Sequence, residues 1–179
     1  MGFFKTLSIV IAIFISINVK ALDFYVGGGT TFSGVISESD YYNGATAIIP
    51  SANVGIRYDT ISLEGFFRPG TLKNDHQGYK IDLETLQFGF MFRFTLEDIV
   101  DLNLGYHSTA VEGSSSVYNG TKLSGLLDQT FSSVVFGMGF NFPITEALRV
   151  RTDFNYYIGK EIYSLLQFDI SVTYNVISF

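Results

Sequence analysis

The chain has 179 residues, 47% of them hydrophobic, with 18 phenylalanines, 11 tyrosines, no tryptophan and no cysteine. Without Lys5 and Lys20 in its first segment, 9 basic residues stand against 17 acidic ones, a formal charge of −8. This composition excludes a disulfide framework and thiol chemistry, and it argues against nucleic acid as a partner.

Residues 1–21 are expected to be a secretory signal peptide. Lys5 provides a charged start, residues 7–17 are apolar, and Val19 and Ala21 fit a cleavage site before Leu22. An uncleaved anchor is the alternative, but the apolar run is short of the roughly 20 residues that a membrane-spanning helix needs. No second hydrophobic run follows, so we expect residues 22–179 to form one exported domain.

The rest of the chain contains eight stretches in which apolar residues alternate with polar residues or glycine. This period of two predicts strands with different environments on their two faces. Each stretch is about long enough to cross a bilayer as a tilted strand, which takes roughly 9–11 residues. In chain order the expected strands are residues 24–34, 48–58, 61–68, 86–94, 100–107, 131–142, 148–156 and 167–176.

The connections between these strands alternate in length. Residues 59–60, 95–99 and 143–147 are short turns, whereas the other four connections are longer, more polar or more irregular: 35–47, 69–80, 109–130 and 160–163. This asymmetry is typical of bacterial outer-membrane barrels, which have short periplasmic turns and longer external loops. An even number of strands then places both termini at the periplasmic end.

Every arginine falls on the polar face of an expected strand, while Lys73, Lys80, Lys122 and Lys160 fall in or beside loops. An arginine on the lipid face would cost about 2–4 kcal/mol at the membrane midplane, so we expect a charge network inside a closed barrel. Its predicted members are Arg57, Glu64, Arg93, Asp101, Arg149, Arg151, Asp153 and Asp169.

Two pairs within this network are predicted from hairpin register. If Phe94 opposes Val100, Arg93 lies across from Asp101, and Glu64 lies diagonally near Arg57. A soluble β-sandwich would also show alternation. It would not normally reserve arginine and asparagine for its core while giving phenylalanine the other face, so we expect an all-β, eight-stranded, antiparallel up-and-down transmembrane barrel.

These features resemble the small eight-stranded outer-membrane barrels, the group of the OmpA transmembrane domain, OmpX and the Opa/NspA-type surface proteins. The resemblance implies a location in the bacterial outer membrane, in contact with its lipids and lipopolysaccharide. It also implies a C-terminal assembly signal that the outer-membrane insertion machinery reads, which Phe179 and Ile177 match. The apolar set before them, however, switches to Val176 and Tyr174. A bulge near residues 176–177 would reconcile the two registers, and without one Phe179 would point inward.

Three functions are compatible with this fold. An eight-stranded barrel is wide enough only for its own side chains, which disfavours a small or gated porin-like channel. A lipid A-modifying enzyme would need a serine with a histidine base; His107 and Ser108 are adjacent, so their side chains should point to opposite faces.

We therefore expect no catalytic residues, cofactor or metal site. The segments 35–44 and 112–120 combine tyrosine with serine, glycine and asparagine, a composition suited to recognition. A structural or surface-interaction role, with a host or phage surface as a possible ligand, is the favoured function. Tyrosines near the strand ends, among them Tyr106, Tyr156 and Tyr157, are expected to form interfacial girdles.

Overall fold

The computed structural model describes residues 22–36, 44–76, 79–118, 121–124, 130–159 and 164–178. Its regular elements are nine strands: β1 (Leu22–Ile36), β2 (Thr46–Tyr58), β3 (Ile61–His76), β4 (Tyr79–Leu96), β5 (Val100–Tyr118), β6 (Thr121–Ser124), β7 (Thr130–Pro143), β8 (Leu148–Gly159) and β9 (Ser164–Ser178). Among these residues there is no helix long and apolar enough to cross a membrane.

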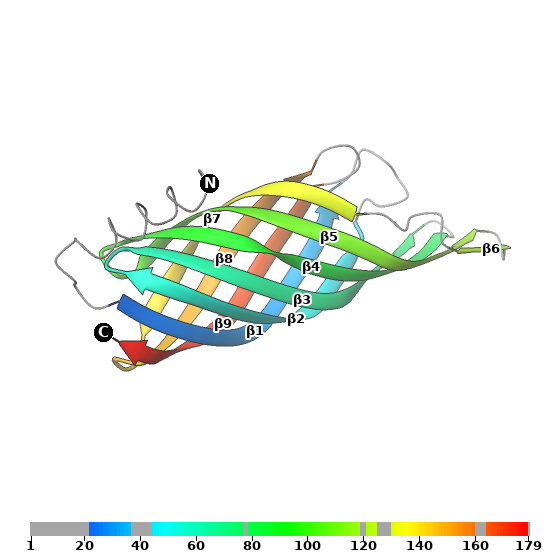
Figure 1. Cartoon of the computed structure of the whole chain (residues 1–179). Coiled ribbons are helices and arrows are strands. Elements are labelled where there is room, and N and C mark those ends of the chain that lie inside the picture. Colours follow the sequence, from blue (N-terminus) through cyan, green and yellow to red (C-terminus); the bar gives the residue numbers. More distant parts are fainter. Residues whose placement is uncertain are drawn as a thin grey trace, which may run out of the picture.

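Eight of the strands close into a barrel. The pairings run in the order β4-β3-β2-β1-β9-β8-β7-β5, and an additional β4–β5 pairing joins the two ends. All of these pairs are antiparallel, and the closed cylinder is visible in Figure 1. The predicted eight-stranded up-and-down barrel is thus confirmed, with the short strand β6 added at the far end of β5.

Most of the large apolar side chains lie on the outside of the barrel. Along β4, Phe88, Phe90 and Phe92 are 43–53% exposed, whereas Gln87 and Arg93 are at most 2% exposed. Successive side chains of a strand point to opposite faces, so the period-two alternation of the sequence places the phenylalanines outside and the polar residues inside. A sandwich with its phenylalanines in a central core is therefore wrong for this chain.

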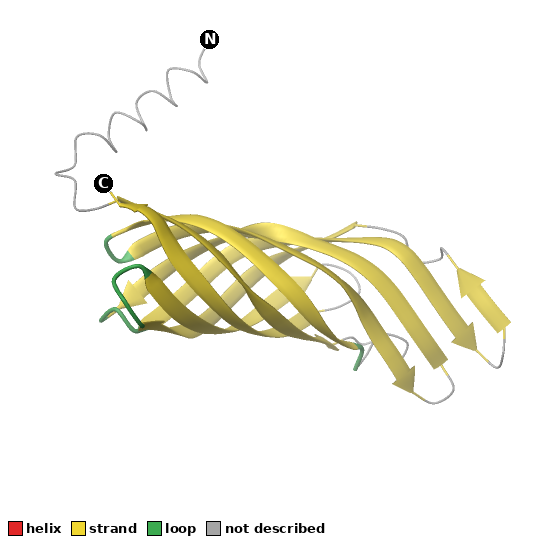
Figure 2. Ribbon diagram, turned by 90° about the horizontal axis from the view of Figure 1, so that it is seen from below, coloured by secondary structure: helices red, strands yellow, loops and turns green. Residues whose placement is uncertain are grey.

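The two ends of the barrel differ, as expected. The turns at residues 59–60, 97–99 and 144–147 lie at the same end as the C-terminus, and Figure 2 shows them there as loops. At the other end, which the connection lengths predict to be extracellular, β3, β4 and β5 continue well past their neighbours.

This extension corrects the prediction that residues 69–80 and 109–130 form irregular loops. The β3–β4 ladder is paired without interruption from Ile61 opposite Phe94 to His76 opposite Tyr79. The sequence of the distal part is mostly polar, so the apolar alternation that marks the other strands is lost there and the strands were not predicted.

The β4–β5 register also differs from the prediction. Val100 opposes Leu96, and therefore Arg93 opposes Asn103, two residues from the expected Asp101. The cause is a shorter turn, of residues 97–99 only, closed by the Ile99 amide donating to the Leu96 carbonyl at 3.1 Å. Glu97 and Asp98 take positive φ values of 49° and 59° to make this turn possible.

Of the two possibilities left open at the C-terminus, the structure has the bulge. The pairing of β1 with β9 shifts between Phe24 and Tyr25, which oppose Ile177 and Asn175, so Val176 is the extra residue. Tyr174 and Val176 point outward, so regular alternation would turn Ile177 inward. The extra residue instead leaves Ile177 outward, 48% exposed. Phe179 lies outside the described residues.

Candidate functional site

The lumen of the barrel holds most of the buried charge of the molecule. Arg57, Glu64, Arg93, Asp101, Arg151, Asp153 and Asp169 are all buried, and Arg149 is half-buried. Arg68, which the predicted network omitted, is buried as well. Among the described residues, four buried arginines thus face four buried carboxylates, so the lumen is close to electrically neutral.

Glu64 is the centre of the network. Its Oε1 accepts a hydrogen bond from Arg93 Nη2 at 2.9 Å, and its Oε2 is bonded to Arg151 Nη2. Tyr25 donates its hydroxyl to the same carboxylate at 3.1 Å. Because β3 and β8 are four strands apart in both directions around the barrel, the Glu64–Arg151 ion pair crosses the full width of the lumen.

A second ion pair lies on the extracellular side of the first. Arg68 Nη2 contacts Asp169 Oδ1 at 3.2 Å, and Arg68 Nη1 donates to the Tyr157 hydroxyl and the Gln167 Oε1 at 2.8 and 2.7 Å. Gln167 in turn donates to Gln87 Oε1 at 2.9 Å. This layer joins β3, β4, β8 and β9 across the barrel.

Two asparagines connect the layers. Asp153 Oδ1 accepts from Arg93 Nη1 at 2.7 Å and from Asn103 Nδ2 at 3.1 Å. Asn103 also donates to Asn155 Oδ1 at 3.1 Å, and Asn155 donates to Asp169 Oδ2 at 3.0 Å. The result is one continuous network, in which charged partners have neutral amides as their neighbours.

The two predicted pairs are not those of the structure. Asp101 accepts a hydrogen bond from Thr95 at 2.7 Å, and the carboxylates that contact Arg93 are Glu64 and Asp153. Arg57 is on the strand beside Glu64, but its guanidinium lies over the Tyr25 ring at 5.2 Å. The prediction considered only adjacent strands, whereas arginine is long enough to reach across a narrow lumen.

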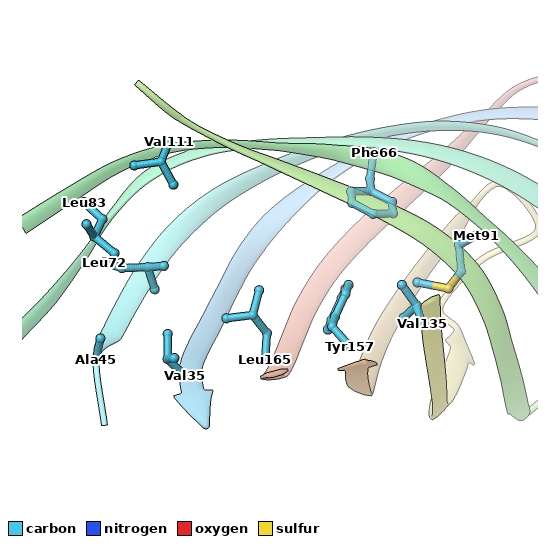
Figure 3. Packing of buried hydrophobic residues seen from close by; sticks show 10 residues of the cluster. All are labelled: Val35, Ala45, Phe66, Leu72, Leu83, Met91, Val111, Val135, Tyr157 and Leu165. Carbon is cyan, nitrogen blue, oxygen red and sulfur yellow. The ribbon is translucent and has the colours of Figure 1, made fainter. Parts of the chain in front are cut away.

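Toward the extracellular end, the inward positions become apolar. A set of six buried side chains, which we name the outer apolar band, comes from β1, β3, β4, β5, β9 and the residue before β2; Figure 3 shows them converging. They are Val35, Ala45, Leu72, Leu83, Val111 and Leu165. Sequence reasoning missed this band, because apolar residues at inward positions were not expected in a polar lumen.

His107 is an inward-facing residue between the band and the network. It is fully buried, with its ring 4.6 Å from that of Tyr157 and 6.0 Å from that of Phe66. Its Nε2 lies 3.2 Å from Thr109 Oγ1, and Ser108 is buried as well. His107 Nδ1 has no hydrogen-bond partner, and the described residues contain no group of three or more potential metal ligands of the His, Cys, Asp or Glu type.

The expected tyrosine girdle is partly wrong. Tyr106 and Tyr156 are outward, 41% and 40% exposed, but Tyr157 is fully buried in the lumen, where its hydroxyl accepts from Arg68. Adjacent residues of a strand face opposite sides, so Tyr156 and Tyr157 never share the lipid face.

No protein-family model matches this sequence, and no curated protein matches it either. Solved structures do match the fold. Neisserial surface protein A covers 87% of this chain and 99% of its own, with a TM-score of 0.60 and 14% identity. Ail, the attachment invasion locus protein of Yersinia pestis, covers 90% and 100%, with a TM-score of 0.58 and 12% identity.

The outer membrane protein OprG of Pseudomonas aeruginosa is a third match, covering 90% of this chain and 97% of its own, with a TM-score of 0.56 and 13% identity. At such low identity these structures show a shared fold, that of the small outer-membrane barrels. Together with the apolar exterior, this fold identifies the chain as an outer-membrane β-barrel protein.

Proposed function

We propose that this protein is a plugged, non-enzymatic barrel that acts at the cell surface, in recognition or adhesion, through its extracellular strands and loops. The observation that carries the proposal is the length of β3, β4 and β5, which have 16, 18 and 19 residues. A strand needs only about 9–11 residues to cross the membrane, so part of each extends into the extracellular medium as a paired sheet (Figure 2).

The contents of the lumen support this role over that of a channel. The ion pairs that cross the barrel and the outer apolar band occupy successive levels of the lumen, so a solute would have to displace both. The lipid A-modifying alternative has weaker support. A serine nucleophile needs a histidine base beside it, whereas the His107 Nε2 lies next to Thr109 and its Nδ1 has no hydrogen-bond partner, and consecutive side chains of a strand point to opposite faces.

Two of the proteins with the same fold have surface roles in their names. One is a surface protein, and the other is an attachment invasion locus protein whose structure was solved with a heparin analogue, sucrose octasulfate. They support surface recognition as a use of this fold. The ligand of this chain, on a host cell or a phage, is part of the proposal, as is assembly by the insertion machinery through Ile177 and Phe179.

Trimming the projecting sheet tests the proposal. In one variant an Asn-Gly turn replaces residues 74–81, which leaves the Lys73–Asp82 pair in place, and in a second it replaces residues 116–123, which leaves Ser115 opposite Ser124. Asn-Gly suits a two-residue hairpin. Cells that display the intact protein should adhere to cultured epithelial cells or adsorb phage, and cells with either trimmed variant should do so at least about tenfold less.

Folding is checked separately. Unboiled samples of the intact and trimmed proteins should migrate on a gel as the same compact, heat-modifiable species, because the trimmed residues lie beyond the barrel. Equal adhesion by intact and trimmed proteins would contradict the proposal. Lipid A whose mass changes when the protein is expressed would instead favour the enzyme, and His107→Ala should then abolish that change.

A further inference from the structure

We infer that the outer wall of the barrel carries a specific site for lipid A, the phosphorylated glycolipid of the outer leaflet, with its acyl chains on β9, β1 and β2 and a phosphate at Lys73. The site is a groove of about 840 Å³ on the lipid-facing side. We name it the wall groove. Its walls and floor come from five neighbouring strands, β8, β9, β1, β2 and β3.

The lower part of the wall groove is aromatic and aliphatic. Phe154, Phe168, Phe32 and Ile48 follow one another across four strands, since each opposes the next in the sheet registers. The Phe154 and Phe168 rings are 4.7 Å apart, and those of Phe168 and Phe32 are 6.1 Å apart. This row offers a continuous apolar surface of the kind that an acyl chain covers.

Gly34 forms the floor one step nearer the cell exterior. It lies between Leu166 and Thr46 in the next row of outward residues. A Cβ added at Gly34 would meet only the Leu166 carbonyl, at 4.0 Å, so the backbone does not require glycine here. The missing side chain instead keeps the groove open where it runs toward the extracellular rim.

The outer end of the wall groove carries a positive charge. Lys73 opposes Thr46 in the β2–β3 register, is exposed, and lines the groove together with Thr71. An ammonium and two hydroxyls beside an apolar surface complement a phosphate attached to acyl chains. In the outer leaflet of the outer membrane, the lipid with that chemistry is lipid A.

A carboxylate also lies near this end. Asp82 opposes Lys73 in the β3–β4 register and is exposed. It reduces the attraction of Lys73 for a bare phosphate, since a like charge nearby opposes binding of an anion. Removing the charge of Asp82 should therefore increase the affinity for the phosphate. The test thus includes one variant that binds more tightly beside those that bind more weakly.

A second groove provides a matched control. It has a volume of about 600 Å³ and lies on the outward side of β2–β5, around Gly65, with Phe67, Phe88 and Phe90 in its wall and no charged residue in its lining. A Cβ added at Gly65 would also meet nothing closer than 3.9 Å. A leucine at Gly65 fills this groove as a leucine at Gly34 fills the wall groove, but only the wall groove is lined by a cation.

The experiment counts lipid A molecules that stay bound to the purified protein in detergent, by native mass spectrometry during titration with hexa-acylated lipid A. The intact protein should retain one lipid A. Lys73→Ala and Gly34→Leu should each weaken retention by about tenfold, the loss expected for one charged contact or one blocked apolar surface. Lys73→Arg and Gly65→Leu should bind like the intact protein, and Asp82→Asn more tightly.

Four results would overturn the inference. Equal retention by all variants would mean that the exterior binds lipid without a specific site. Equal retention of dephosphorylated lipid A would mean that the phosphate makes no contact with the site. Full displacement by inorganic phosphate alone would mean that the acyl chains make none. A change in the mass of the protein assembly on Gly34→Leu would mean that a second copy of the chain, and not a lipid, covers the groove.

Discussion

Glu64 shows how one residue can organise the lumen. Its two oxygens serve Arg93 on the adjacent strand β4 and Arg151 on the opposite wall, and all three side chains are at most 2% exposed. In such a buried site, removal of one partner leaves the other charges uncompensated, which costs far more than the ion pair itself contributes.

Glu64→Ala should therefore lower the free energy of unfolding by about 3–5 kcal/mol, the usual cost of breaking a buried ion pair. Urea unfolding of the protein in lipid vesicles measures the change. Glu84→Gln on the neighbouring strand β4 is the control; Glu84 is exposed, so its substitution should change stability by no more than about 0.5 kcal/mol. Equal effects of the two variants would refute the central role of Glu64.

Glycines in the barrel wall make room for larger neighbours on the inward face only. A Cβ added at inward-facing Gly89 would lie 2.7 Å from the Phe66 ring and would also clash with the backbone carbonyl of Tyr106. The same addition at outward-facing Gly65 meets nothing closer than two backbone carbonyls at 3.9 Å.

We expect Gly89→Ala to destabilise the barrel by about 1–3 kcal/mol, because the overpacked residue must displace Phe66 or the strand. Gly65→Ala should change stability by no more than about 0.5 kcal/mol. The same urea titration compares them, and a Gly89→Ala protein as stable as the parent would show that the wall yields more easily than this close packing implies.

At the scale of elements, the turn between β4 and β5 sets the register of that hairpin. Positive φ at both of its central residues, Glu97 and Asp98, is the signature of a type I′ turn, for which asparagine followed by glycine is the best sequence. Glu97 and Asp98 carry the steric cost of a Cβ at positive φ. Their sequence does not resemble the asparagine-glycine pair, so it does not announce this turn.

Asp98→Gly should consequently raise the free energy of unfolding by about 0.5–1 kcal/mol, since glycine takes positive φ without the steric penalty of a Cβ. Asp59→Gly in the β2–β3 turn, where φ is 53°, should act in the same direction. A loss of stability in both variants would mean that side-chain contacts of these aspartates outweigh the backbone strain.

At the scale of the whole molecule, two barriers stand in series along the lumen. The first is the ion-pair network around Glu64, and the second is the outer apolar band, which disfavours entry of ions because it offers them no polar partner. Either barrier alone should close the barrel.

In planar bilayers the intact protein should show no steady single-channel current. Glu64→Ala, Arg68→Ala, Arg93→Ala and Arg151→Ala combined, which remove both ion-pair layers, should also remain closed, because the band persists. Addition of Leu72→Ser and Leu165→Ser should open a small conductance. A steady current through the intact protein, or through the fourfold variant at the level of the sixfold one, would contradict this arrangement.

The same scale explains which predictions succeeded. Alternation alone located eight strands and their outward faces, and the exclusion of arginine from the apolar face indicated where the charges lie. The projecting parts of β3, β4 and β5 were missed, because their sequence is mostly polar and lacks the alternation. The outer apolar band was missed because inward positions were recognised by their polarity, whereas the inward residues of the band are apolar.

The sequence by itself determined the barrel. The alternation of lipid-facing apolar residues with lumen-facing polar ones is a local property that each strand carries independently. Only the tertiary structure decided which charges meet. Glu64 and Arg151 are 87 residues apart along the chain and face each other only because closure places β3 opposite β8. Closure is a property of all eight strands together, and no single segment encodes the distance across the cylinder.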